Sequence, residues 1–590
     1  MMGLQKSYPK LSSRVLSYLW VAKLNCLTAG QLWNSVASGS GRRKQKFIFG
    51  VFSLIVLFCV CSLVVSCGKA TQSAHIYPNF SFQEKRVWVH VIQGPDYNQS
   101  EPGKTHGALY PLGLASSSNT NRSIFQINRF KTAGIDGLSV NMFEDQNVSN
   151  SLLDWLKVAD GTGLVVAPCI DGIGHEDKVV QLVKDYAALA SSHSSAAREN
   201  GKLVIFIFVT GGLSPASWEN VRQRIREAGI GTYFVANIDA GLSQYKDFPC
   251  RKISQYFPAF EAGYVFDDTY MKFWHEILTL FRSFNHTFAG GLEPGYDRET
   301  PNGGEVDALA TELYRKGWQA QIDAKIQWTH VATWNDLVEH TEIRPTSDWN
   351  FTRSDLTAWY AAIFKGQPAP ISSPQLYVTS PQQVHLNQTA PAEALVLNPT
   401  EKALTVQIQL FDGNARAVTN VISATVGAGK AAAATIPVKL TTMPSGRFLR
   451  AHATMLKGKT VVQTVISAPI LVYNARFKTN LRRLYYSIPA QHAIPGKVGL
   501  SIPGNPLKGT VTATVTPPSG IAVRFAEVLQ NTWEVKNMFN QPPYTTNVPL
   551  TNGNQIVGYQ VITDDPSGFY MARVIDEQER VGYSDPIYKE

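Results

Sequence analysis

A repeating rhythm in residues 86–366 constrains the fold of this chain more than any other feature. Short apolar runs that each suit one strand alternate with amphipathic stretches of helix length, and the last such stretch covers residues 353–366. Eight of these units in about 280 residues predict an α/β fold of the (β/α)₈ or TIM barrel type, with an open doubly wound sheet as the alternative. No glycine-rich phosphate-binding motif follows the first run, which disfavours a nucleotide-binding sheet. The strand candidates are residues 86–93, 137–143, 164–171, 203–210, 232–239, 253–266, 286–294 and 326–334.

The pattern changes after residues 366–375, where helical periodicity fades and alternating apolar and polar residues take over. This alternation, broken by Pro and Ser, is typical of antiparallel sheets. We therefore predict a barrel over residues 85–368 followed by two antiparallel β-sandwich domains over residues 369–476 and 477–590. No catalytic cluster is visible in either sandwich. A structural brace against the barrel is the predicted role, with sugar binding as the alternative.

The positive charge of the chain is concentrated at its start. The formal net charge of the 590 residues is +9, and residues 1–46 contribute +8 of it, because they hold eight Lys or Arg and no Asp or Glu. The remainder carries only +1. A nearly neutral body does not predict a nucleic-acid-binding surface.

This basic head is followed by residues 47–66, an uncharged and apolar stretch that is long enough to span a bilayer. The basic residues before it predict that its N-terminal side faces the cytoplasm. The sequence "VVSCGK" around Cys67 resembles a bacterial lipobox, which implies a lipidated Cys67 and a tether over residues 67–84. An uncleaved signal anchor is the alternative. Both interpretations place the folded body outside the cytoplasm, anchored at the membrane of the cell envelope.

Cysteine usage argues against a disulfide framework and against a metal centre. Of six cysteines, only Cys169 and Cys250 lie beyond the head and the apolar stretch. Two cysteines so far apart do not form a metal-ligand motif. We therefore expect no metal and no cofactor, while the oligomeric state is not predicted.

Polar residues at the ends of the predicted strands form the candidate site. A (β/α)₈ barrel has its active site at the carboxyl ends of its strands. Each of these residues alone suits an ordinary solvated loop, so the prediction depends on their meeting at one face. The candidates are His90, Asn141, Asp171, Asp239, Glu293 and the pair Asp336 and Glu339.

The pair Asp336 and Glu339 in "WNDLVEHTE" has two interpretations. A carboxylate followed by Glu three residues later resembles a capping box at the start of a helix. The same two carboxylates, just past the last predicted strand, suit an acid and a base at an active site.

Three motifs resemble known families of glycoside hydrolases. The stretch "ATWNDLVEHTEI" resembles the Trp-Asn-Asp-Tyr-Gly-Glu signature of family 71, the α-1,3-glucanases, and also the Asn-Glu-Trp-His-Glu-Gly-Thr-Gln-Ile-Glu signature of family 99, the endo-α-mannosidases and mannanases. The stretches "VWVHVIQG" and "AGIDGLSVNM" resemble the first two strand segments of family 71. The resemblance covers about residues 85–366 and does not extend into the sandwiches.

The resemblance implies roles for individual residues. Glu339 would be the general acid, and Asp336 would activate water, as in family 71, or the sugar 2-hydroxyl, as in family 99. The chain departs from the family patterns at Leu337, Val338 and Arg344, which affects the sugar subsite. Substrate contacts are expected from Tyr296, Trp334 and Asn335; Trp88, Tyr296 and Trp334 are sugar-stacking candidates that equally suit a core.

Three functions follow as hypotheses. The first is a membrane-tethered, endo-acting α-glycoside hydrolase that cleaves an extracellular or periplasmic α-glucan or α-mannan. The second is a barrel that binds glycans without cleaving them. The third is a structural protein of the cell envelope.

Overall fold

The structure is a computed structural model in which the chain divides into two units, Met1–Ser81 and Phe82–Glu590. All described residues belong to the second unit, and only that unit is discussed below. The described residues are 85–92, 119–143, 150–208, 210–237, 254–265, 274–297, 305–337, 339–473, 484–502, 510–531, 556–562 and 569–588.

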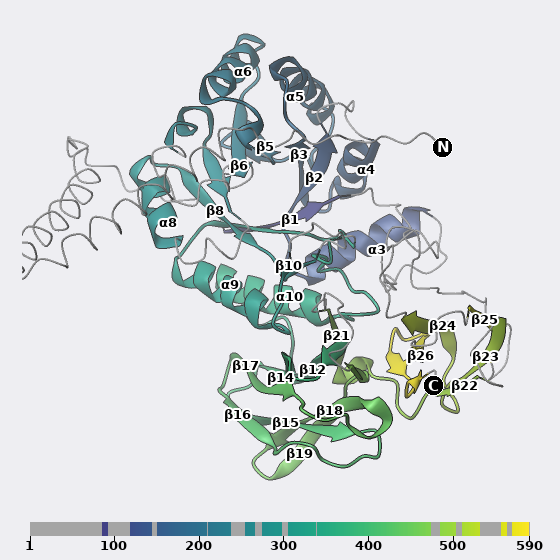
Figure 1. Ribbon diagram of the computed structural model, residues 1–590. Coiled ribbons are helices and arrows are strands. Elements are labelled where there is room, and N and C mark those ends of the chain that lie inside the picture. The colour runs from purple at the N-terminus through teal and green to yellow at the C-terminus, as the bar shows by residue number, and fades with distance from the viewer. Residues whose placement is uncertain are drawn as a thin grey trace, which may run out of the picture. The chain divides into compact units, whose positions relative to one another are not determined.

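Eight parallel strands close into a barrel (Figure 1). They pair in the order β3-β2-β1-β11-β8-β7-β6-β5, and a further pairing of β3 with β5 closes the ring. This closure confirms the predicted barrel and excludes the open sheet. The strands are β1 (Arg86–Val91), β2 (Gly137–Phe143), β3 (Val165–Asp171), β5 (Lys202–Ile207), β6 (Thr232–Asn237), β7 (Ala262–Tyr264), β8 (Thr287–Leu292) and β11 (Trp328–Val331).

Several strands are shorter than the apolar runs that predicted them. The run at 253–266 yields only the three residues of β7, because a 3₁₀ turn at Phe257–Ala259 interrupts it. Pro258 lies inside that turn, and a proline has no N–H to give to a sheet. The run at 326–334 becomes the four-residue β11, after which the chain forms turns.

Helices follow most of the strands and surround the barrel (Figure 1), whereas the described chain between β6 and β7 has the 3₁₀ turn at Phe257–Ala259. Their apolar faces pack on the outward side chains of the strands in one core, which includes Trp155, Trp218 and Trp318. The last helix, predicted at residues 353–366, ends with Gly366 in the left-handed conformation, where glycine is favoured. The helices are α3 (Asn119–Thr132), α4 (Asn150–Ala159), α5 (Glu176–Ala190), α6 (Pro215–Glu227), α8 (Trp274–Ser283), α9 (Glu312–Asp323) and α10 (Thr352–Lys365).

The inward side chains of the barrel strands form a second, separate core. Trp88, Phe206, Tyr264 and Trp328 fill it, and the Trp88 and Phe206 rings meet edge to face at 5.0 Å. Alternate residues of a strand point to opposite faces, so the inward and outward sets can be read along each strand. On β1, for example, Val87, Val89 and Val91 belong to the outer core, whereas Trp88 belongs to the inner one.

Antiparallel sheets follow the barrel, as predicted. Two sheets enclose one apolar core, with strand orders β17-β14-β12-β21 and β13-β20-β18-β15-β16, and β19 pairs with β18. Their strands are β12 (Gln375–Pro381), β13 (Gln383–His385), β14 (Thr389–Asn398), β15 (Leu404–Asp412), β16 (Ile422–Val426), β17 (Lys430–Lys439), β18 (Phe448–Lys457), β19 (Thr460–Ile466), β20 (Ile470–Tyr473) and β21 (Tyr485–Pro489).

Two more sheets form the last domain, with strand orders β22-β23-β25 and β24-β26-β27, and β28 pairs with β26. The boundary predicted at residue 476 does not coincide with the sheets, because β21 lies beyond it and pairs with β12 of the first sandwich. The remaining strands are β22 (Gly499–Ser501), β23 (Thr510–Thr516), β24 (Val523–Asn531), β25 (Ile556–Ile562), β26 (Phe569–Asp576), β27 (Val581–Tyr583) and β28 (Ile587–Tyr588).

Candidate functional site

The strand alternation directs three predicted site residues toward the mouth of the barrel. His90 follows the inward Trp88 by two residues, and Asp171 follows the inward Cys169 in the same way. Asn141 is paired in register with Cys169. Side chains two residues apart on a strand share a face. His90, Asn141 and Asp171 therefore belong to the inward set at the carboxyl ends of β1, β2 and β3.

Two histidines and a serine form a polar layer across the inside of the barrel. The Ser139 hydroxyl lies 3.2 Å from Nδ1 of His90 and 2.5 Å from Nε2 of His330. Burial lowers the pKa of His90 to about 4, and burial, followed by the proximity of His90, lowers the pKa of His330 well below its usual value. Both imidazoles are therefore neutral at neutral pH and act as hydrogen-bonding groups. His330 and Ser139 were not predicted as site residues, although each is a polar residue inside an apolar strand.

Asp171 is half-buried at the end of β3. Its Oδ1 accepts a hydrogen bond of 2.6 Å from the N–H of Gly172. Burial raises the pKa of Asp171, and this hydrogen bond opposes the rise. Phe143, its partner in register on β2, is 43% exposed and is an aromatic candidate for sugar contact that sequence reasoning missed.

Asp336 and Glu339 lie in a turn and not at the start of a helix, because α10 begins only at Thr352. The Asp336 carboxylate nevertheless accepts a 3.1 Å hydrogen bond from the N–H of Glu339, as a capping aspartate would. The N–H of Asp336 donates to the Thr333 hydroxyl at 2.8 Å. The local hydrogen bonding expected of a helix cap is thus present without the helix, and the helix-start interpretation is wrong.

The β9–β10 hairpin also contacts Glu339. Its strands are β9 (Tyr296–Asp297) and β10 (Glu305–Val306). The Tyr296 hydroxyl donates to Oε1 of Glu339 at 3.4 Å, and the N–H of Asp297 donates to the Glu339 carbonyl at 3.0 Å. Tyr296 therefore lies beside Glu339, the candidate acid.

Backbone pairing closes the base of this turn. The N–H of Thr333 donates to the carbonyl of Thr341, and the N–H of Ile343 donates back to Thr333, both at 2.9 Å. One residue further, the N–H of Arg344 donates to Trp334 at 3.1 Å. The N–H of Trp334 in turn donates to the carbonyl of His90 at 2.7 Å, which ties the turn to β1. We call residues 332–351 the β11–α10 loop and residues 333–340 its tip.

Trp334 and Trp88 lie in the core. For both residues a core position was the alternative to stacking on a sugar. Trp334 is 1% exposed, its ring lies 4.3 Å from that of Phe130, and its indole N–H donates to Gln126 at 3.0 Å. Trp88 is fully buried inside the barrel. Neither indole presents a face to a ligand in this structure.

Asn335 and Leu337 are also buried. The Asn335 side-chain oxygen accepts from the N–H of Ile92 at 2.9 Å, so Asn335 fastens the tip to the end of β1. Leu337, one of the departures from the family patterns, is 1% exposed and therefore does not line an open groove. Arg344, another departure, is 3% exposed, and burial lowers its pKa to about 10.

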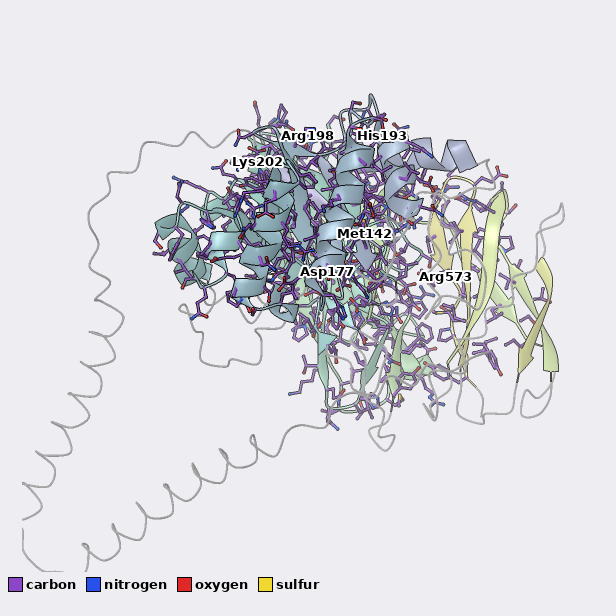
Figure 2. All side chains as sticks on the ribbon, turned by 90° about the horizontal axis from the view of Figure 1, so that it is seen from above. Met142, Asp177, His193, Arg198, Lys202 and Arg573 are labelled. Carbon is purple, nitrogen blue, oxygen red and sulfur yellow. The ribbon has the colours of Figure 1, made fainter. Side chains whose placement is uncertain are left out.

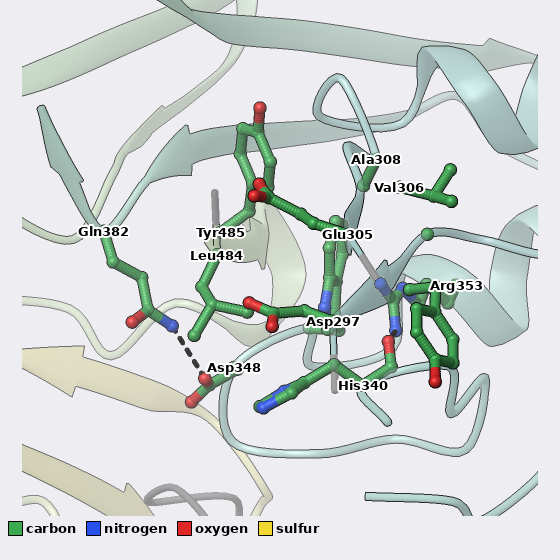
Figure 3. A pocket seen from close by; sticks show the side chains of 13 residues that line it. Asp297, Glu305, Val306, Ala308, His340, Asp348, Arg353, Gln382, Leu484 and Tyr485 are labelled. Atoms are coloured by element: carbon green, nitrogen blue, oxygen red, sulfur yellow. Dashed lines mark hydrogen bonds between the residues drawn. The ribbon is translucent and has the colours of Figure 1, made fainter. Parts of the chain in front are cut away.

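A small pocket lies behind the tip (Figure 3). The volume open to the centre of a water molecule is about 20 Å³, which is enough for about one or two waters but not for a sugar. Glu293, half-buried just after β8, lies near enough to Arg353 of this pocket to influence its pKa. The pocket is lined by Gly295, Tyr296, Asp297, Glu305, Val306, Ala308, His340, Asp348, Trp349, Arg353, Gln382, Leu484 and Tyr485.

Some predictions fall outside the described residues. These are Asp239, Val338, the apolar stretch at 47–66 and the lipidation candidate Cys67. Within the part of the chain that the structure describes, no helix combines the length and the apolar character needed to cross a membrane. Within that same part, no group of His, Cys, Asp and Glu side chains could hold a metal ion.

The fold and the site together define a (β/α)₈ barrel with two carboxylates at the carboxyl end of its last strand. No protein-family model matches the chain, and the comparison with curated proteins gave no match.

Among solved structures, a family 99 endo-α-mannosidase from Bacteroides thetaiotaomicron in complex with BIS-TRIS-propane gives a TM-score of 0.42 at 16% identity, over 48% of this chain and 98% of that chain. A second structure of a family 99 endo-α-mannosidase from this organism gives 0.40, with the same identity and coverage. A β-D-mannosidase from Dictyoglomus thermophilum gives 0.28 at 10% identity, over 75% of this chain and 58% of that chain. These scores are too low to carry an argument about function.

Proposed function

We propose that this protein is a glycoside hydrolase in which Asp336 and Glu339 perform the acid–base chemistry. The observation that carries the proposal is the position of both carboxylates in one half-buried turn, directly after β11 of a closed barrel. Active sites of such barrels lie at this end of the strands. Glycosidic bond cleavage uses two carboxyl groups beside the scissile bond, which is the chemistry that this turn offers.

Glu339 is the proposed general acid. The Tyr296 hydroxyl donates to its Oε1, which helps to orient the carboxyl group. Asp336 is the proposed base, and it activates either water or the sugar 2-hydroxyl. The hydrogen bond that Asp336 accepts from the N–H of Glu339 holds its carboxylate in place within the turn.

The proposed substrate is an α-linked glucan or mannan, cleaved within the chain. This follows from the resemblance of the tip to the signatures of families 71 and 99. His90, Asn141, Asp171 and Phe143 at the ends of β1, β2 and β3 would extend the site along the barrel mouth. Phe143, with its exposed ring, is the proposed sugar-stacking residue in place of the candidates Trp334 and Trp88.

We further propose that the protein works at the cell envelope, held to the membrane through Cys67 or through a signal anchor. The support is the uncharged stretch at residues 47–66, the basic residues before it and the lipobox-like sequence that follows. Replacing Cys67 by Ser would release the protein from membranes or block its processing if Cys67 is lipidated. Unchanged membrane retention would support the signal anchor.

Depolymerisation of defined polysaccharides tests the proposed reaction. The full chain is incubated separately with α-1,3-glucan and α-mannan, and the products are separated by size. Oligosaccharides from one of the two substrates are the expected result. Binding on a glycan array without release of products would favour the glycan-binding barrel, and neither binding nor cleavage would favour a structural envelope protein.

A further inference from the structure

Residues 341–351 of the β11–α10 loop are buried at every position, and we call them the junction segment. Loops normally run over the surface, because their polar groups need water or other partners. The junction segment is nevertheless rich in polar side chains. They are Thr341, Glu342, Arg344, Thr346, Ser347, Asp348 and Asn350.

The two sandwich domains supply partners for Asp348: Gln382, drawn with Asp348 in Figure 3, and Arg573, labelled in Figure 2. Arg573, on β26, is fully buried, and its Nη1 lies 2.5 Å from Oδ1 of Asp348. The Gln382 side chain donates to Oδ2 of Asp348 at 2.8 Å, and the N–H of Ser487 donates to the Asp348 carbonyl at 2.7 Å. Asp348 is thus held by both sandwiches at once.

The residues on either side of Asp348 are held in the same way. The Tyr583 hydroxyl donates to the carbonyl of Ser347 at 3.1 Å, and the Ser487 hydroxyl donates to Thr352 at 2.8 Å. The ring of Phe351 stacks on His492 with 4.2 Å between their centres. Residues that follow the barrel in the sequence therefore hold the first turn of α10 in place.

Arg353 connects the junction segment to the tip. Its Nη1 donates to the carbonyl of His340 at 2.9 Å and to that of Glu342 at 2.8 Å. Its guanidinium lies over the ring of Trp349 at 3.8 Å from the ring centre. Because His340 follows Glu339 directly, a shift of the junction segment would move the candidate acid.

We infer that Arg573 is a positioning residue: through Asp348 it holds the junction segment, and with it the turn that carries Asp336 and Glu339. The sandwiches are then part of the working site, since Arg573, Gln382 and Ser487 all hold Asp348. The effect of Arg573 on catalysis rests on the proposed function, whereas its effect on the position of the loop does not.

The experiment compares two buried ion pairs that both join the barrel to later strands. Arg573→Met removes the partner of Asp348. Arg315→Met removes the partner of Glu393, whose carboxylate pairs with Arg315 of α9 at 2.6 Å and also accepts from the Thr311 hydroxyl, both outside the loop. Hydrogen exchange is measured in the full chain for the amides of Ile343 and Asn350, and kcat and KM are measured on the polysaccharide that the wild type cleaves.

Arg573→Met is expected to speed hydrogen exchange at the amides of Ile343 and Asn350 by about 10-fold or more. It should also lower kcat on the order of 10²-fold, with a smaller change in KM, because a shift of about 1 Å in the catalytic carboxylates has that cost. Arg573→Lys, which keeps a donor and a charge, should restore much of both. Arg315→Met should leave both near wild type.

Wild-type exchange in the folded Arg573→Met variant would overturn the inference, and so would equal effects of Arg573→Met and Arg315→Met. If the wild type cleaves no glycan, the proposed function fails, and the exchange comparison still decides whether Arg573 positions the loop.

Discussion

The tip and the junction segment of the β11–α10 loop are adjacent in sequence but are held in different ways. In the tip, the two carboxylate-bearing residues are linked by short-range hydrogen bonds, from Glu339 to Asp336 and from Asp336 to Thr333, each between residues three positions apart. Trp334 and Asn335 tie the tip to β1 of the barrel. The junction segment depends on distant partners, such as Arg573, which lies 225 positions from Asp348. The side chains of Asp336 and Glu339 stay half-buried, whereas the junction segment is fully buried. The proposed catalytic residues and the contacts with the sandwiches thus lie in different halves of one loop.

The largest expected effect comes from Glu339→Gln in the tip. This change keeps the shape and the hydrogen bond from Tyr296 but removes the proton that the acid would transfer. Turnover on a natural glycan should fall by a factor on the order of 10² to 10⁴. A substrate with an activated leaving group needs little protonation and should lose far less, which is measured by steady-state kinetics on both substrates. Equal losses on the two substrates would contradict the acid role.

Arg353→Met in the next helix should instead act on stability. Glu342, fully buried, would lose its ion-pair partner, whose Nη1 lies 3.3 Å from its carboxylate. Removing one partner of a buried pair costs about 3–5 kcal/mol of the free energy of unfolding. Urea unfolding measures the loss. Lys316→Met, which breaks the exposed pair with Glu312 on α9, is the control and should change stability by about 1 kcal/mol or less.

A third effect concerns pH and the barrel interior. Burial lowers the pKa of His90 to about 4 from an ordinary value of 6.5. Between these values the unfolded chain binds the proton and the folded barrel does not, so stability is lost as the pH falls from about 6.5 to about 4. Between pH 7 and pH 5 the loss from His90 is roughly 2 kcal/mol. His90→Gln should reduce the difference between urea unfolding curves at the two pH values, and an unchanged difference would contradict this account of His90.

The smallest expected effect is that of Tyr296→Phe, which removes the hydroxyl that Glu339 accepts from. The contact is long, at 3.4 Å, and such bonds contribute about 0.5–1.5 kcal/mol. We expect kcat to fall by roughly 3-fold to 10-fold, with a shift in the acidic or basic limb of the pH–rate profile, because this hydroxyl contacts the group that titrates. A loss of stability with an unchanged profile would place Tyr296 in a purely structural role.

The sequence was sufficient to predict the barrel, because strand and helix periodicity are local. It also predicted which strand ends carry polar residues, and the alternation along β1, β2 and β3 explains why His90, Asn141 and Asp171 belong to one set. The antiparallel sheets after the barrel were predicted for the same reason.

Contacts between residues far apart in the sequence could not be predicted from local patterns. His330 and Ser139 meet although 191 residues separate them, and nothing near either residue predicts the contact. Trp334 has an aromatic ring that would suit stacking on a sugar. Phe130 and Gln126 of α3 contact this ring instead and bury it. The strand β21 returns to the first sandwich because pairing with β12 completes that sheet, which no local pattern at residues 485–489 indicates.

The carboxylate chemistry of the tip is tested most directly by Asp336→Asn, assayed on a natural polysaccharide and on an aryl glycoside with an activated leaving group. Removing the base should lower turnover on both substrates by a factor on the order of 10² to 10⁴, whatever the leaving group. The variant should stay folded, because losing a capping hydrogen bond costs only about 0.5–2 kcal/mol. A folded Asp336→Asn protein that cleaves both substrates at the wild-type rate would contradict the account.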